Sequence, residues 1–287
     1  MVISRRQFLT YAGGVTAACA LPGCENPEPV ADSPPRRTLG KTGLSLTLIG
    51  FGAQRVSDPS VVAYALDKGI NHIDTSLEYD CSVVESALKG GRDGVHLMVA
   101  TRALGHHLGQ RQAADQEFLV YLRKTFPRTI ESMLRRLHTG VIDVFLLKQI
   151  SRPELIETDW ILESLANWRR EGKVRCCGVT SHENEAEILR AVANSDVFQV
   201  AIVPFNYKSP PEIAIEIEQA VRKGTGVIAM KTQSPNFRDP EGIIGDAEDH
   251  RQALKWVLSK EFVAAAIPGM TTNEQVDLNL RAINGLA

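Results

Sequence analysis

From residue 36 to the C-terminus, short β-rich runs alternate with longer stretches that carry apolar residues at helical spacing. This alternation is the pattern of βα units around a parallel sheet, because parallel strands are joined by helical crossovers. The predicted strands are 45–50, 71–74, 96–101, 142–147, 174–179, 197–202, 226–230 and 262–267, and clear helices are 117–137, 160–170, 212–223 and 249–258. Eight such units predict an α/β fold of the (βα)8 TIM-barrel type, with the active site at the carboxyl ends of the strands.

An open, doubly wound sheet is the alternative architecture. It requires a Gly-rich phosphate-binding turn after the first strand, and Gly50-Phe51-Gly52 is too weak a match.

A length of 287 residues suits one α/β barrel. The chain is 44% hydrophobic and carries a net charge of −2, which indicates a full core and argues against nucleic acid as a partner.

The first residues read as a targeting segment rather than as part of the fold. Residues 4–9, Ser-Arg-Arg-Gln-Phe-Leu, match the twin-arginine export motif, and the apolar stretch 10–20 is too short to span a bilayer as a mature helix. We therefore expect residues 1–24 to be a signal segment recognised by the twin-arginine export machinery. The barrel domain is then 36–287.

Two interpretations remain open for the end of this segment. Leu21-Pro22-Gly23-Cys24 resembles a lipoprotein cleavage site, which would leave Cys24 lipidated. Alternatively, an ordinary signal peptidase cleaves the segment, or Cys24 is an unmodified residue of the spacer. Residues 25–35 are Pro-rich and polar and are expected to form an extended tether. The protein is accordingly expected to be exported, either periplasmic or membrane-anchored and facing the periplasm.

The five cysteines do not suggest a disulfide framework. Cys19 and Cys24 belong to the signal segment, Cys81 follows a predicted strand, and Cys176 and Cys177 are adjacent on a strand, where neighbouring side chains point to opposite faces. No spacing fits a metal site.

Residues 71–79, Asn-His-Ile-Asp-Thr-Ser-Leu-Glu-Tyr, end an apolar run with an acid and place a tyrosine five residues later. An acid at a strand end and a tyrosine in the following loop lie where barrel enzymes carry out catalysis. This stretch resembles the signature of the aldo-keto reductases, in which such an Asp and Tyr form a catalytic tetrad with a Lys and a His. The resemblance assigns Asp74 and Tyr79 to the first two positions.

The other two tetrad positions depart from the family pattern. The family Lys ends the next strand, which here reads His-Leu-Met-Val-Ala-Thr-Arg and ends with Arg102. The family His ends the following strand, which reads Ile-Asp-Val-Phe-Leu-Leu-Lys and ends with Lys148. The resemblance therefore implies a catalytic set of Asp74, Tyr79, Arg102 and Lys148.

In the family the Tyr protonates the carbonyl oxygen while NADPH delivers hydride to the carbon. A phenol of pKa ~10 is a poor acid at neutral pH, and a cation within ~4–6 Å can lower that pKa by ~1–3 units. Arg102 can supply the charge and pair with Asp74, although it cannot release a proton. Lys148 adds a second cation, so the set carries a formal excess of one positive charge. We expect Lys148 to donate the proton or to stabilise the oxyanion, and anionic substrates to be favoured.

Other blocks extend the resemblance from about residue 36 to the C-terminus. Residues 37–43 resemble the hairpin that plugs the family's barrel floor, and the loop after Tyr79 looks shortened. Ser181 and Gln199 match contacts to the nicotinamide carboxamide. A helix cap and a hydrogen-bonded core amide are the alternative roles of these two residues.

The segment 266–279 resembles the family's phosphate-binding end of the barrel. Backbone N–H groups at the start of the last helix would hold the pyrophosphate. The residues assigned to this end are Gly269, Met270, Thr271, Glu274 and Asn279, of which the last two match adenine contacts.

Cofactor preference is open at this stage. NADP-specific members place a Lys or Arg after the Pro-Gly for the 2′-phosphate, whereas this chain has Met270 and Thr271. A charge-assisted bond is worth ~1.5–3 kcal/mol, so its absence predicts less preference for NADPH or weaker binding of either cofactor. Lys231, after the seventh strand, either replaces that cation or is an ordinary cation at the barrel mouth.

Three functions follow from these observations. The first is an NAD(P)H-dependent reductase of small carbonyl compounds, acting as a monomer. The second is a degenerate barrel that binds a cofactor or ligand without turnover. The third is a lyase, isomerase or hydrolase that uses Lys148 with Tyr79, including Schiff-base chemistry if Lys148 is desolvated.

Overall fold

The computed structural model describes residues 34–89, 91–101, 116–233 and 247–286. The signal segment and almost all of the tether lie outside these ranges, as does Arg102. No helix within the described ranges is long and apolar enough to cross a bilayer.

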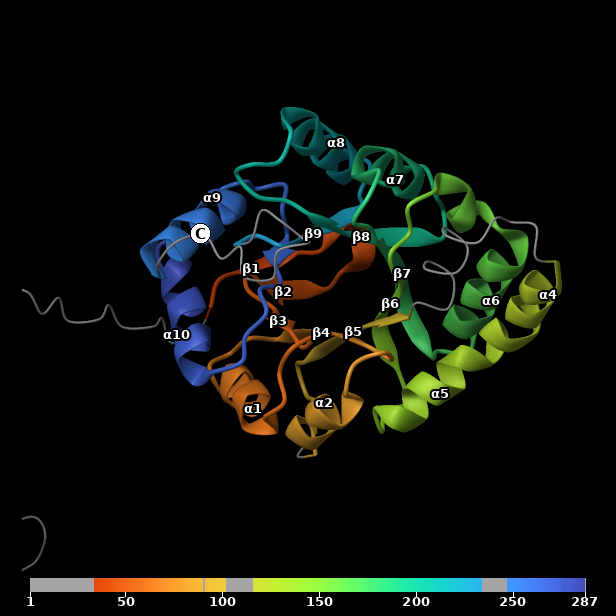
Figure 1. Cartoon of the computed structure of the whole chain (residues 1–287), viewed down its shortest axis with the longest axis horizontal. Coiled ribbons are helices and arrows are strands. Elements are labelled where there is room, and N and C mark those ends of the chain that lie inside the picture. The colour runs from red at the N-terminus through yellow and green to blue at the C-terminus, as the bar shows by residue number, and fades with distance from the viewer. Residues whose placement is uncertain (1–33, 90, 102–115, 234–246, 287) are drawn as a thin grey trace, which may run out of the picture.

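Eight parallel strands form the central sheet, and each pairs with its neighbour in chain order (Figure 1). The ring closes where the N–H of Gly50 donates to the carbonyl of Ala266 and the N–H of Ala266 donates to the carbonyl of Leu48, each at 2.8 Å. The predicted (βα)8 barrel is therefore confirmed. The strands are β3 (Phe51–Gly52), β4 (His72–Ser76), β5 (His96–Thr101), β6 (Ile142–Leu147), β7 (Val174–Thr180), β8 (Phe198–Pro204), β9 (Gly226–Met230) and β10 (Ala265–Ala266).

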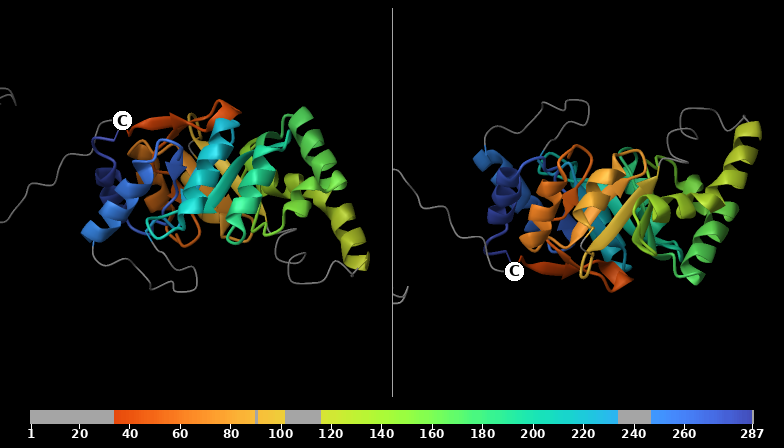
Figure 2. Two further views of the ribbon diagram at one scale, coloured as in Figure 1. Left: turned by 90° about the horizontal axis from the view of Figure 1, so that it is seen from above. Right: turned by 90° about the horizontal axis from the view of Figure 1, so that it is seen from below.

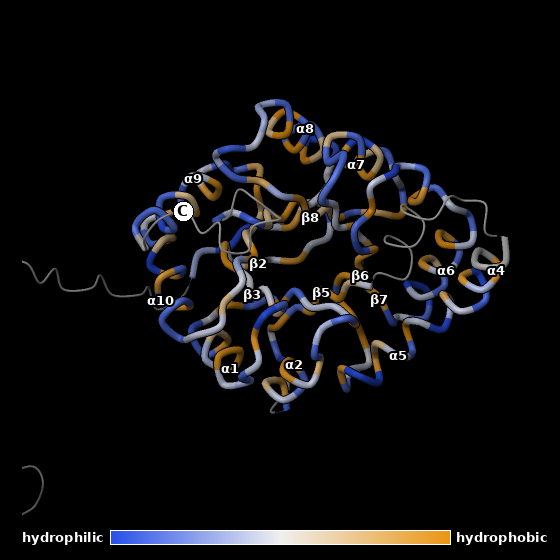
Figure 3. The backbone as a smooth tube through the Cα atoms, in the orientation of Figure 1, coloured by the Kyte–Doolittle hydropathy of each residue, from blue (hydrophilic) through white to orange (hydrophobic). Residues whose placement is uncertain are grey.

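Helices surround the barrel, with their apolar sides turned toward the sheet (Figure 3). The predicted helix 117–137 is broken in two, because Pro127 lacks the N–H that a continuous helix needs. The helices are α1 (Pro59–Asp67), α2 (Cys81–Ala87), α4 (Gln116–Thr125), α5 (Thr129–Arg136), α6 (Asp159–Arg170), α7 (Glu185–Ala193), α8 (Pro211–Arg222), α9 (Ala247–Leu258) and α10 (Asn273–Ala282). The described ranges also contain three 3-10 helices, η2 (Gly40–Thr42), η3 (Phe126–Arg128) and η4 (Pro153–Glu157).

A hairpin of β1 (Arg36–Thr38) and β2 (Ser45–Thr47) covers the amino end of the barrel (Figure 2). Leu39, Leu44 and Leu46 of this hairpin pack into the buried cluster that fills the barrel interior. The predicted plug is thus present. It also replaces part of a predicted strand, because residues 45–47 pair with β1 rather than with the barrel.

The buried side chains form two layers, one inside the barrel and one between sheet and helices. Cys176 lies in the inner cluster and Cys177 in the outer one, as their adjacent positions on a strand predict. Both thiols are free, as is that of Cys81. Burial raises the pKa of Cys177 to about 12, so this thiol is inert at neutral pH.

Candidate active site

The barrel brings together three of the four predicted catalytic residues toward the carboxyl ends of β4 and β6, the two strands that flank β5. Asp74 lies within β4, Tyr79 follows β4 in a turn, and Lys148 comes directly after β6. The strand between them is β5, and its last residue, Thr101, accepts a hydrogen bond from the backbone N–H of Lys148 at 3.0 Å. Arg102, the fourth residue, lies outside the described ranges.

Lys148 is the centre of this arrangement. Its side chain is buried, and its ammonium donates to Ser76 Oγ at 2.9 Å and lies 4.0 Å from the centroid of the Tyr79 ring. A cation over an aromatic face is stabilised by the ring quadrupole, and the same positive charge favours the ionised phenol. The predicted pair of Tyr79 and Lys148 is therefore in direct contact.

Glu78 is a site residue that the sequence analysis missed. Its carboxylate lies 3.4 Å from Lys148 Nζ, and it accepts hydrogen bonds from the hydroxyls of Ser76 and Thr101. The sequence signal was present, because Glu78 stands in the same short signature as Asp74 and Tyr79. It was overlooked because the resemblance assigns roles only to those two positions.

This carboxylate changes the charge of the site. Glu78 offsets the charge of Lys148, and with Asp74, Arg102, Lys148 and Glu78 all counted as ionised the formal sum is zero. Glu78 therefore weakens the electrostatic basis of the expected preference for anionic substrates, which stays a prediction.

Asp74 sits in an environment that disfavours its charge. Burial raises the pKa of Asp74 to about 7, and the nearby Lys148 opposes this shift. Among the described residues, no group donates a hydrogen bond to the buried Asp74 Oδ1. An acceptor of this kind fits the predicted pairing with a cation at the end of β5.

The two predicted nicotinamide contacts lie on neighbouring strands. Ser181 is fully buried just beyond β7, and its hydroxyl donates to the carbonyl of Glu183 at 2.6 Å in a local turn. Gln199 lies on β8 beside the step from Cys177 to Gly178, where the strand register shifts. Its buried Oε1 has no hydrogen-bond partner among the described residues, so it fits the amide N–H₂ of a carboxamide. The structure does not bring Ser181 and Gln199 to the same level of the sheet.

The start of α10 already satisfies part of its own backbone. The Thr271 N–H donates to Gln275 Oε1 at 2.7 Å, and Thr272 Oγ1 caps the helix by accepting from the Gln275 N–H. Glu274 is exposed, and a hydrogen bond with its own backbone N–H lowers the pKa of its carboxyl. A pyrophosphate at this end would have to displace these side chains.

Three more predicted contacts differ in their exposure. Gly269 is exposed, whereas Met270 is fully buried in the core and Asn279 is also buried. Asn279 Oδ1 accepts a hydrogen bond from Gln233 Nε2 at 2.8 Å. Met270 therefore presents neither charge nor an exposed side chain where NADP-specific relatives place a cation.

Lys231 follows β9 at the barrel mouth, with a left-handed φ of 53°. Its carbonyl accepts a hydrogen bond from Asn206 Nδ2. Partial burial lowers the pKa of Lys231 to about 8, and Glu185 opposes the shift. This side chain is therefore still mostly cationic at neutral pH.

The described residues contain no cluster of three or more side chains suited to a metal ion.

Comparison with known proteins agrees with this geometry. Residues 50–234 match the model of the aldo/keto reductase family, and residues 2–22 match the twin-arginine translocation signal. A curated relative, the uncharacterized oxidoreductase YqkF of Bacillus subtilis strain 168, is 22% identical over 288 residues, which cover 87% of this chain and 91% of the relative.

Two solved structures share the fold. Aldo-keto reductase AKR11C1 of Bacillus halodurans, in its holo form, is 21% identical with a TM-score of 0.67 over 87% of this chain and 91% of that one. An aldo/keto reductase of Klebsiella pneumoniae, solved with NADP and acetate, is 20% identical with a TM-score of 0.65 over 86% of this chain and 89% of that one.

Proposed function

Because the chain belongs to the aldo/keto reductase family, we propose that it reduces small aldehydes or ketones with a nicotinamide cofactor. The contact of Lys148 with Tyr79 at the strand ends carries this proposal. The Klebsiella relative was solved with NADP, which supports a cofactor of the same class here. When bound, such a cofactor supplies the hydride.

In this proposal Tyr79 gives a proton to the substrate oxygen as the hydride reaches the carbon. The positive charge of Lys148 beside the phenol ring lowers the cost of the phenolate that remains. Glu78 and Ser76 hold the ammonium in place and keep the site near neutrality. Asp74 is proposed to pair with Arg102, which would take the role of the family Lys.

We propose Gln199 for the nicotinamide carboxamide, Ser181, which lies farther toward the strand ends, for the same half of the cofactor, and the segment from Gly269 to Asn279 for the rest of it. Met270 and Thr271 offer no cation to a 2′-phosphate, so among the predicted cofactor contacts Lys231 is the cation proposed for it. Fluorescence titration with NADH and NADPH should therefore give dissociation constants within about tenfold of each other, or ~1.4 kcal/mol. A much stronger preference for NADPH would mean that Lys231 or another residue supplies the contact to the 2′-phosphate.

A barrel that binds its cofactor without turnover is the second candidate. The side-chain contacts at the start of α10 favour it, because they occupy groups that a pyrophosphate would use. Oxidation of NAD(P)H over a panel of aldehydes, ketones and keto acids separates the two candidates. Turnover supports the reductase, whereas binding of the cofactor without turnover of any compound supports the second candidate.

The lyase and Schiff-base alternatives are less favoured, because the Lys148 ammonium is buried among hydrogen-bond and charge partners.

The signal at residues 2–22 supports export. We propose that the folded barrel is carried to the periplasm with its cofactor bound and acts there as a monomer, soluble or anchored through Cys24. A small-molecule substrate would then be met outside the cytoplasm.

A further inference from the structure

An open groove of about 800 Å³ lies at the amino end of the barrel, away from the strand ends that carry Tyr79 and Lys148. It is formed where α6 ends and where β6 and β7 begin. Its apolar floor includes Val141, Ala166 and Val174, and its charged side chains are Arg169, Arg170 and Arg175. None of the residues that line it carries a negative charge.

The two arginines of α6 have little to neutralise them. Arg170 donates to the uncharged amide oxygen of Asn167 at 2.9 Å, and within the described part of the chain no carboxylate pairs with Arg169 or Arg170. Glu131 on α5 and Glu171 at the end of α6 are both bound by Lys173, at 2.5 and 2.6 Å.

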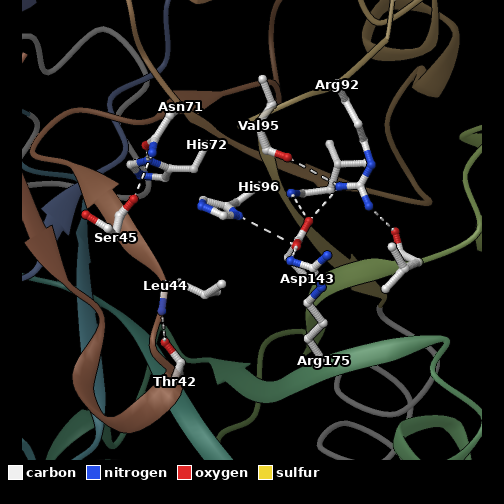
Figure 4. A network of polar contacts seen from close by, with 12 residues as sticks. Thr42, Leu44, Ser45, Asn71, His72, Arg92, Val95, His96, Asp143 and Arg175 are labelled. Carbon is white, nitrogen blue, oxygen red and sulfur yellow. Dashed lines mark hydrogen bonds and ion pairs between the residues drawn. The ribbon is translucent and has the colours of Figure 1, made fainter. Parts of the chain in front are cut away.

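Arg175 shares its acid with other groups (Figure 4). Asp143 lies 3.0 Å from Arg175, but it is also bound by Arg92 at 2.6 Å and by the N–H of Leu97 at 2.9 Å, and His96 lies 3.6 Å away. Burial raises the pKa of Asp143, but hydrogen bonds from His96, the Leu97 N–H and Arg92 outweigh it and lower this pKa to about 2, so Asp143 stays ionised. One carboxylate therefore balances more than one cation, and the groove keeps a positive charge.

The helix dipole explains part of this pattern, because cations are favoured in the last turn of a helix. It explains neither Arg175, which lies on a strand, nor the convergence of the three side chains on one groove. Guanidinium groups pair with phosphate oxygens through two parallel hydrogen bonds, and they do so with less dehydration cost than an ammonium. We propose that this groove binds a phosphoryl group, carried by a free phosphate or by a phospholipid headgroup.

A phospholipid headgroup is compatible with the path of the chain. The hairpin covers the same amino end of the barrel, and Pro34, where the described chain begins, lies near Gly69 in the loop before β4. The described chain therefore enters the barrel at the same end as the groove.

The test compares the full chain with Arg169→Ala/Arg170→Ala and with Arg222→Ala as a matched control. Arg222 is an exposed arginine in the last turn of α8 and lies outside the groove. One arm titrates inorganic phosphate by calorimetry at constant ionic strength. The other measures sedimentation with vesicles of phosphatidylglycerol or phosphatidylcholine.

We expect binding in at least one arm, weakened about tenfold or more by the double substitution and unchanged by Arg222→Ala. Phosphate binding identifies a soluble ligand, and binding only to phosphatidylglycerol vesicles identifies a headgroup. The proposal is overturned if neither arm shows binding, if the double substitution has no effect, or if Arg222→Ala weakens binding equally. Cofactor binding measured on the same three proteins checks that each is folded.

Discussion

Glu78 lies one residue before Tyr79, and its carboxylate meets the Lys148 ammonium at 3.4 Å. The sequence analysis expected a surplus positive charge at this site. Glu78 offsets it, because its carboxylate balances the ammonium of Lys148. Whether a substrate carries a charge should then matter little. Removing the charge of Glu78 tests whether this carboxylate sets the preference for charged or neutral substrates.

We predict that Glu78→Gln shifts selectivity toward keto acids. Removing one negative charge leaves the formal excess of +1, which attracts a substrate carboxylate. The ratio of kcat/KM for a keto acid to that for a neutral aldehyde should rise by about tenfold, or ~1.4 kcal/mol. Glu157→Gln, an exposed change on η4, serves as the control. An unchanged ratio in Glu78→Gln would mean that Glu78 does not set the charge felt by the substrate.

Asp74 gives a prediction about stability. Its pKa is raised to about 7 in the fold, so the folded protein binds its proton more tightly than the unfolded chain does. The contribution of Asp74 to stability is therefore greatest below pH ~4 and is lost as pH rises to ~7, at a cost of at most ~4 kcal/mol. Asp74→Asn should gain stability relative to the wild type between these pH values in urea unfolding. A constant difference over this range would show that the Asp74 pKa is not raised.

At the scale of elements, the residue just before β3 and the start of β4 meet at a tight contact. A methyl group on Gly50 would overlap the imidazole of His72, which is fully buried at the start of β4. Burial lowers the pKa of His72 to about 3, so the ring is neutral in the fold. The spacing between β4 and the chain that closes the barrel therefore depends on a glycine at this position.

Gly50→Ala is expected to destabilise the protein by ~1–3 kcal/mol through overpacking. His72→Ala alone should also destabilise it, but the double variant should recover part of the first loss, because the ring that the methyl group meets is gone. Chemical unfolding of the two single variants and the double variant measures this coupling. Strictly additive losses would contradict the contact.

For the molecule as a whole, the barrel could be predicted because its signal repeats along the chain. Each strand and helix carries its own apolar pattern, and errors at one boundary do not change the topology. Residues 45–47 were assigned to the wrong sheet, since the apolar pattern cannot tell which neighbour a strand pairs with. The role of Glu78 was missed for a similar reason, because it depends on Lys148, which is distant in the sequence.

Export is a second property of the whole molecule. Replacing Arg5-Arg6 with Lys-Lys should retain the protein in the cytoplasm, because the twin-arginine machinery reads that pair. The same change at Arg169-Arg170, a pair on the surface of α6, should leave export intact. Cell fractionation with detection of the protein in each fraction measures both. Export of the Arg5-Arg6 variant at the wild-type level would rule out this route.

The central claim is that Tyr79, held against Lys148, performs reductase chemistry. The most direct test of this claim is the rate of NAD(P)H oxidation at saturating cofactor with the best carbonyl substrate of the panel. The rate is measured for the wild type, for Tyr79→Phe and for the control Tyr121→Phe, which lies on the outer helix α4. Loss of one positioned acid should lower the rate of Tyr79→Phe by ~10²–10⁴, with the cofactor dissociation constant unchanged and Tyr121→Phe at the wild-type rate. A Tyr79→Phe protein that turns over at the wild-type rate, or a wild type that binds the cofactor and reduces none of the compounds, would contradict the account.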